Sequence, residues 1–282
     1  MSNDTGLRIE YGPQSATIEV SGPLTDGPAL QLDRMLTVLR DYYGYHQIQL
    51  RIHSPGGQLL ALQHMLAALG RWRAAGGKVA THATMETGSA AALLLAMGEL
   101  GARSAQPHTQ LLFHHTRILT QGDSGLTAAS AVATAQRLLG FDQALIDRVV
   151  GHLQAGRGGT QPLGQAGGAR CAALRAQFDE TADALGLRAE RREPAWLKNA
   201  AAAYDRVTGN GKIEVYSRLL ARRFERDERM DLREAWVLQL IDDVEGVPVL
   251  SPEPEPQRSD AQPRADADPS PDSATRPMRL AA

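Results

Sequence analysis

A serine and a histidine occupy positions in this sequence where hydrolytic chemistry is feasible. Ser89 follows Thr87-Gly88 at the expected start of a buried helix, where the next backbone N–H has no partner within the helix. His114 ends the next expected strand, and a neutral imidazole beside a serine can take its proton and return it to a leaving amine. Taken singly, the serine is more commonly a plain helix N-cap and the histidine a partly buried strand-end residue. The pair indicates acyl-transfer chemistry only in combination with a further feature.

That feature is the loop Ser54-Pro55-Gly56-Gly57, which follows an alternating apolar strand and precedes an amphipathic helix. Glycines lack a Cβ atom, so the backbone at this loop can approach a ligand closely. Bare N–H groups can stabilise a developing oxyanion, although Pro-Gly-Gly alone is usually a simple turn. The ordered set of loop, Ser89 and His114 favours a shared role over three separate coincidences.

The elements that must position these residues alternate between strands and helices. Strands are expected at 16–20, 47–53, 78–84 and 110–114, separated by amphipathic helices and by the uniformly apolar helix 89–97. This alternation predicts a parallel sheet with crossover helices. A long helix is expected over 126–152, and a short helix around Glu234-Ala235-Trp236 is expected to lead into a strand at 238–241.

Composition bounds the class of protein. The 282 residues are 43% hydrophobic, which allows a sizeable core, and 30 basic against 32 acidic side chains leave no basic stripe for nucleic acid. A single cysteine, Cys171, excludes an intramolecular disulfide. The polar N-terminus lacks the pattern of a signal peptide, and no window is apolar enough for a membrane span, so a soluble cytoplasmic protein is expected. Adjacent strand residues such as His114 and His115 point to opposite faces, so they make a poor metal chelate.

With its Ser-Pro-Gly-Gly loop, its serine at a helix start and its strand-borne histidine in this order, the chain resembles the proteolytic subunit of the Clp protease family. The resemblance covers about 16–152 and resumes near 224–244. It implies an α/β fold of the type shared by Clp subunits and crotonases, a repeated β-β-α superhelix with a protruding helical handle. The domain plan is then an N-terminal lead at 1–15, a peptidase domain at 16–250 with a helical insertion at about 153–222, and a disordered tail at 251–282 rich in Pro, Ser and Asp.

The resemblance also implies roles for individual residues in a serine endopeptidase. Ser89 would be the nucleophile, His114 the general base and then acid, and Asp227 the orienting carboxylate, with Asp231 as the fallback. The backbone N–H groups of Gly57 and Ala90 would form the oxyanion hole, and the substrate would contact Gly56, Gly57, Phe113 and His115. The family's asparagine before the loop is His53 here, and its Gln-Pro after the histidine is His115-Thr116.

The partners implied are peptide or unfolded protein substrates, identical subunits in a ring and an AAA-type ATPase unfoldase, with no cofactor, metal, nucleic acid or membrane. Three alternatives stay open. One is an inactive structural ring subunit. Another is a crotonase-type acyl-CoA enzyme, which only Glu86 favours, and the third is a membrane-linked peptidase with a Ser-Lys dyad, for which Lys78, Lys198 and Lys212 are poorly placed.

Overall fold

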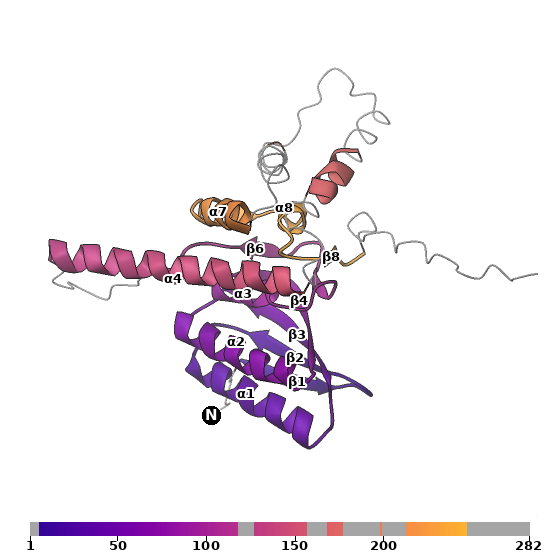
Figure 1. Ribbon diagram of the computed structural model, residues 1–282. Coiled ribbons are helices and arrows are strands. Elements are labelled where there is room, and N and C mark those ends of the chain that lie inside the picture. The colour runs from indigo at the N-terminus through magenta and orange to yellow at the C-terminus, as the bar shows by residue number, and fades with distance from the viewer. Residues whose placement is uncertain (1–5, 118–126, 157–167, 177–197, 199–212, 247–282) are drawn as a thin grey trace, which may run out of the picture. The chain divides into compact units, whose positions relative to one another are not determined.

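The computed structural model describes residues 6–117, 127–156, 168–176, 198 and 213–246 (Figure 1). The chain divides into two units, residues 1–251 and 252–282, and only the first contains described residues. The expected disordered tail at 251–282 therefore lies outside the described residues, as does most of the expected insertion at 153–222.

The fold is mixed α/β and is built on one eight-stranded sheet. Its strands are β1 (Leu7–Tyr11), β2 (Ala16–Ser21), β3 (Gln47–Ser54), β4 (Lys78–Gly88), β5 (Arg103–Ala105), β6 (Gln110–Leu112), β7 (Arg229–Met230) and β8 (Asp243–Val244). The order is β1-β2-β3-β4-β5-β8, and β6 pairs with both β4 and β7. All pairings are parallel except β1 with β2 and β6 with β7, so the expected parallel core is confirmed and carries two antiparallel edges.

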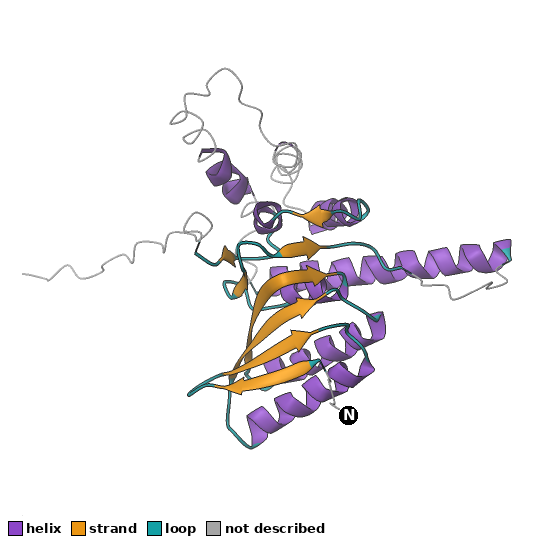
Figure 2. Cartoon of the chain, turned by 180° about the vertical axis from the view of Figure 1, so that it is seen from behind, coloured by secondary structure: helices purple, strands orange, loops and turns teal. Residues whose placement is uncertain are grey.

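The named helices are α1 (Asp26–Asp41), α2 (Leu59–Ala74), α3 (Ala90–Ala96), α4 (Ala128–Ala155), α7 (Ile213–Phe224) and α8 (Leu232–Val237). Figures 1 and 2 show α1 and α2 side by side on one face of the sheet. Each crossover helix connects two parallel strands, as the strand spacing predicted.

Apolar periodicity accounts for this packing. Ile48, Leu50 and Ile52 alternate along β3 and are all buried, whereas the residues between them are partly exposed. In α3 every residue is buried, which confirms the expectation for its uniformly apolar sequence. In α4 the first half is mostly exposed, and the buried residues begin only at Asp142.

Strand β4 positions the candidate site because it changes neighbours along its length. Its first half pairs with β5, and residues 86–88 pair instead with β6. The change coincides with an irregular register against β3 and with Met85, whose φ of 51° is unusual for a residue with a side chain. This bend directs the end of β4 toward the loop after β3.

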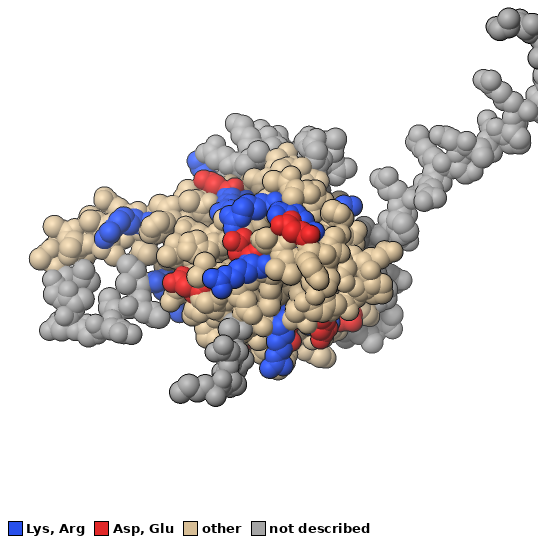
Figure 3. Space-filling view, turned by 90° about the horizontal axis from the view of Figure 1, so that it is seen from below, with Lys and Arg blue, Asp and Glu red and all other residues tan. Residues whose placement is uncertain are grey.

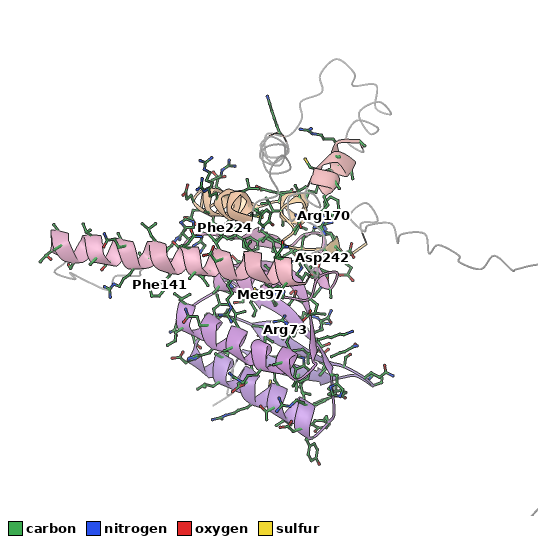
Figure 4. The ribbon with its side chains drawn as sticks, in the orientation of Figure 1. Arg73, Met97, Phe141, Arg170, Phe224 and Asp242 are labelled. Carbon is green, nitrogen blue, oxygen red and sulfur yellow. The ribbon has the colours of Figure 1, made fainter. Side chains whose placement is uncertain are left out.

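A buried ion pair ties the C-terminal end of the described chain to the sheet. Arg103 is fully buried and donates to both carboxylate oxygens of Asp242, at 2.8 and 2.6 Å. Arg170 approaches the same carboxylate at 3.4 Å (Figure 4). Burial by itself would raise the pKa of Asp242, but the hydrogen bonds and charge of Arg103, with Arg170, outweigh it and lower that pKa.

One expectation about the elements needs correction. The apolar run 238–241 is not a strand: it forms a buried turn with Gln239 at φ 60°, and the strand follows at β8. Residues 7–11, which fall in the expected N-terminal lead at 1–15, form β1 and pair with β2. On the surface, Lys and Arg lie interspersed with Asp and Glu on the face shown in Figure 3.

Candidate active site

The loop after β3 contributes Gly57 to the lining of a pocket. Leu24 clamps the loop, because its N–H donates to the Gly56 carbonyl at 2.8 Å and its carbonyl accepts from Gln58 at 2.9 Å. In this parallel bridge between Leu24 and Gly57, the N–H and C=O of Gly57 point away from Leu24. Among the described residues, the Gly57 N–H has no hydrogen-bond acceptor. It is therefore available to a ligand.

Both glycines of the loop are required by close contacts. A Cβ atom on Gly56, at φ +100°, would lie 2.5 Å from the Cβ of Ser89 and 2.6 Å from the Gly88 carbonyl oxygen. A Cβ atom on Gly57 would overlap the backbone of Leu24. The pair of glycines is thus what lets the loop lie directly against Ser89.

Ser89 stands in a strained backbone conformation between β4 and α3. Its φ of 54° and ψ of −126° lie outside the regions that residues with a side chain normally occupy, and such strain tends to gather at functional sites. The Ser89 N–H donates to the Leu112 carbonyl at 2.7 Å, which anchors the strained residue to β6. The side chain makes no capping hydrogen bond to α3, so capping does not explain this serine.

His114 lies two residues beyond the end of β6, and its tautomer follows from its hydrogen bond. The Nδ1 atom is 2.6 Å from the carbonyl oxygen of His115. Because a carbonyl can only accept, Nδ1 carries the hydrogen, and in the neutral ring Nε2 keeps its lone pair. A proton acceptor is what a general base must offer to a serine.

Ser89 and His114 line the same pocket, which has a volume of about 490 Å³. Gly57 and Ala90 also line it, so the nucleophile, the base and both expected oxyanion donors share one cavity. The remaining wall is partly apolar, from Pro23, Leu24, Leu59, Leu62, Leu93 and Leu145. Size does not single out this pocket, because two others measure about 450 and 550 Å³, but neither of those contains Ser89 or His114.

The two candidate acids have other partners. Asp227 follows α7 at φ 54°, is exposed, and forms an ion pair with Arg117. Among the described residues, no hydrogen bond joins Asp227 to His114. Asp231 caps α8 by accepting from the Arg233 N–H at 2.7 Å. The triad role of Asp227 stays a prediction.

The family model of the Clp protease matches residues 12–155, which is just over half of the chain. The chain belongs to the Clp protease family. The match contains the loop, Ser89, His114 and all of α4, and it ends before Asp227. A search of curated proteins finds no match. As a member of this family, the protein is a Clp-type peptidase in general character, which agrees with the resemblance seen in its motifs.

The structure places the other predicted residues of this Clp family member as follows. His115 lines the pocket together with His114, because β6 ends at Leu112 and strand alternation no longer applies beyond it. Phe113 is fully buried and stacks on Phe224 at a ring separation of 5.3 Å, outside the pocket lining. Gly56 is buried against Ser89.

Glu86, whose charge could have disturbed an oxyanion, faces a different cavity. It lines the hollow of about 550 Å³ together with His53, and its N–H donates to the His53 ring at 3.4 Å. The only feature that favoured a crotonase-type enzyme is therefore outside the pocket of Ser89.

One residue beside the site was missed by sequence reasoning. Asp142 is buried on α4 and contacts the two residues that follow His114. Its position four residues before Ile146, on the face that the helix buries, was the available signal. Within the described ranges, no group of three His, Cys, Asp or Glu side chains could hold a metal ion, and no helix is long and apolar enough to span a membrane.

Proposed function

We propose that the protein is a serine endopeptidase in which Ser89 attacks the substrate carbonyl and His114 is the general base. The observation that carries this proposal is the strained, uncapped Ser89 in one pocket with a histidine whose Nδ1 is held by a carbonyl. In the first step, Oγ of Ser89 bonds to the carbonyl carbon and its proton passes to Nε2 of His114. Nε2 then returns the proton to the leaving amine as the peptide bond breaks.

The oxyanion formed in that step would be held by the N–H groups of Gly57 and Ala90. Gly57 is supported as a donor because its N–H points away from Leu24 and has no acceptor among the described residues. Ala90 is the first residue of α3, and first-turn N–H groups have no partner within a helix. Loss of one such donor typically costs on the order of 100-fold in turnover.

The wider proposal follows the family resemblance. Asp227 would complete the triad, the substrates would be peptides or unfolded proteins, and the subunits would assemble into a homo-oligomeric ring with an AAA-type ATPase as partner. The repeated superhelix would then carry the exposed first half of α4 as its handle. The apolar part of the pocket wall supports a peptide substrate, because it can bury a side chain next to the scissile bond.

A fluorophosphonate probe tests the assignment of the nucleophile. Oγ of Ser89 displaces fluoride from phosphorus, and the hydroxyl proton goes to Nε2 of His114, so covalent labelling reports both groups. We expect the wild type to label and Ser89→Ala to lose labelling completely. His114→Ala should lose most of it, by on the order of 100-fold or more. Peptide mapping of the labelled protein should recover the probe on residue 89.

Ser15→Ala is the matched control, because Ser15 is exposed in the turn between β1 and β2 and does not line the pocket. Ser15→Ala should label like the wild type. Equal labelling of wild type and Ser89→Ala, or no labelling of the folded wild type, would show that Ser89 is not an activated nucleophile.

A further inference from the structure

The residue after His114 lies close to two other elements. The Nε2 atom of His115 lies 3.1 Å from the carbonyl oxygen of Ala221 on α7, and since a carbonyl only accepts, Nε2 is the donor. The Nδ1 atom of His115 lies 3.5 Å from a carboxylate oxygen of Asp142 on α4. Figure 4 labels Phe141 and Phe224, which mark the two helices that hold this histidine.

Asp142 is the more unusual of these partners, because it is a carboxylate on the buried face of a helix. The residue is 7% exposed and stands in line with Ile146, Val149 and Val150. A buried carboxylate needs hydrogen bonds to offset the loss of water. Its Oδ1 accepts from the N–H of Thr116 at 2.7 Å. Within the described part of the chain, the polar contacts of the Asp142 carboxylate therefore go to the two residues that follow His114.

One peptide group connects Asp142 to the imidazole of His114. The N–H of Thr116 and the C=O of His115 belong to the same planar unit, and they point in opposite directions in a trans peptide. The N–H end donates to Asp142, and the C=O end accepts from Nδ1 of His114 at 2.6 Å. The 115–116 peptide group therefore lies between the Asp142 carboxylate and the His114 imidazole. A rotation of that peptide would break both hydrogen bonds together.

We infer that Asp142 is a positioning residue for His114, acting through the 115–116 peptide group. The carboxylate fixes the plane of the peptide, and its charge polarises the peptide so that the carbonyl becomes a stronger acceptor. The carbonyl in turn holds the Nδ1–H tautomer and leaves Nε2 for the proton of Ser89. This inference rests on the proposed function, in which His114 is the base.

Asp142 does this without touching the imidazole, whereas a triad acid would contact Nδ1 directly. In the structure the Nδ1 position is taken by the carbonyl of His115, and Asp227 is paired with Arg117. Hydrogen bonds in a chain strengthen one another, and a charged acceptor at one end gives the largest effect. The buried position of Asp142 protects this effect from screening by water.

Asp142→Asn tests the inference with little change in shape, because its amide oxygen can still accept from Thr116 while the charge is gone. The assay is the rate of fluorophosphonate labelling at several probe concentrations. We expect the maximal rate to fall on the order of 10-fold, and the half-saturating concentration to stay the same because Asp142 itself does not line the pocket. A merely structural role would lower the melting temperature and leave the maximal labelling rate of the folded protein unchanged.

The matched control is Asp147→Asn on the same helix, where the carboxylate is exposed and, among the residues that the structure describes, accepts from Gln143 alone, at 2.8 Å. It should label like the wild type. If folded Asp142→Asn also labels at the wild-type maximal rate, the inference is wrong.

A second measurement does not depend on activity. In protein labelled with ¹⁵N-histidine, the Nδ1–H signal of His114 can be assigned by its loss in His114→Gln. We expect that signal in the wild type and in Asp147→Asn, and we expect it to weaken or exchange faster with water in Asp142→Asn. That result would support the positioning role even if the wild type did not react with the probe, in which case only the proposed function would fail. An unchanged signal in Asp142→Asn would overturn the positioning role.

Discussion

Replacing Gly56 with alanine is the sharpest test of how the loop and Ser89 fit together. Gly56 has φ +100°, and a Cβ atom there would meet the Cβ of Ser89 at 2.5 Å. Alanine in a left-handed conformation costs about 1–2 kcal/mol. The overlap adds about 1–3 kcal/mol, as overpacked sites usually do. Together these give about 2–5 kcal/mol of destabilisation for Gly56→Ala.

Gly76→Ala separates the two causes. Gly76 has a similar φ of +83°, but a Cβ atom there would find nothing within 4 Å. This variant should therefore lose only the backbone component of about 1–2 kcal/mol. Urea unfolding of the two variants measures the difference, which is the cost of the overlap between the added Cβ atom and its neighbours Ser89 and Gly88.

Labelling by a fluorophosphonate probe, at a temperature where both variants are folded, measures the functional consequence. Relief of the overlap must move Ser89 or the loop by several tenths of an ångström, and displacements near 1 Å can cost on the order of 100-fold in rate. We expect labelling to be nearly lost in Gly56→Ala and retained in Gly76→Ala. If Gly56→Ala is no less stable than Gly76→Ala and labels at the wild-type rate, the close contact between loop and nucleophile does not exist in solution.

Two further predictions concern the stability of the scaffold. Asp242→Asn should lower the free energy of unfolding by about 3–5 kcal/mol in urea denaturation, because it leaves the charge of fully buried Arg103 uncompensated. The control Asp33→Asn breaks an exposed ion pair and should cost less than about 1 kcal/mol. Equal losses in the two variants would contradict this reasoning. Burial lowers the pKa of His152 against the opposing hydrogen bond to the Gly98 carbonyl, so the unfolded chain binds this proton at higher pH than the folded chain does. The contribution of neutral His152 to the free energy of unfolding is therefore fully present above about pH 6.5, and it is lost as the pH falls below that value. The melting temperature should drop between pH 7.5 and 5.5, and His152→Gln should flatten that drop; an unchanged slope would contradict the assignment.

Long periodic elements of this fold could be predicted from the sequence because each carries its own signal. The alternation in β3 and the apolar faces of α1 and α2 depend on local spacing, and the structure confirms them. The short strands β5 and β8 have three and two residues, and they form only through pairing with distant chain: β5 pairs with β4 and with β8, and β8 follows β5 by more than a hundred residues. No local pattern could reveal them.

The turn at 238–241 shows how burial can imitate a strand. Leu238, Leu240 and Ile241 are all buried, so their apolar character correctly indicates the core. Their conformation is decided elsewhere: α8 ends at Val237, and Gln239 takes a positive φ that a strand cannot accommodate. Apolar runs of four residues indicate burial more reliably than they indicate extended backbone.

The residues of the candidate site also differ in how far the sequence predicts them. Ser89, Gly57 and Ala90 are positioned by the ends of neighbouring elements, which the sequence marks with glycines and a change of periodicity. The contacts of His114 depend on a peptide held from α4, and the sequence carries only the weak signal of an acid on an apolar helix face.

Position in the sequence and contact in the structure therefore point to different carboxylates as the acid that supports His114. The charged stretch that follows α7 points to Asp227, yet that side chain is exposed and paired with Arg117, where water screens its charge. Asp142 is buried, and its charge acts along a peptide that ends at the imidazole of His114. If both carboxylates serve the base, then removing the charge of Asp142 should weaken the nucleophile even with Asp227 intact. The two acids are thus separable by experiment, although the sequence motif draws attention to only one of them.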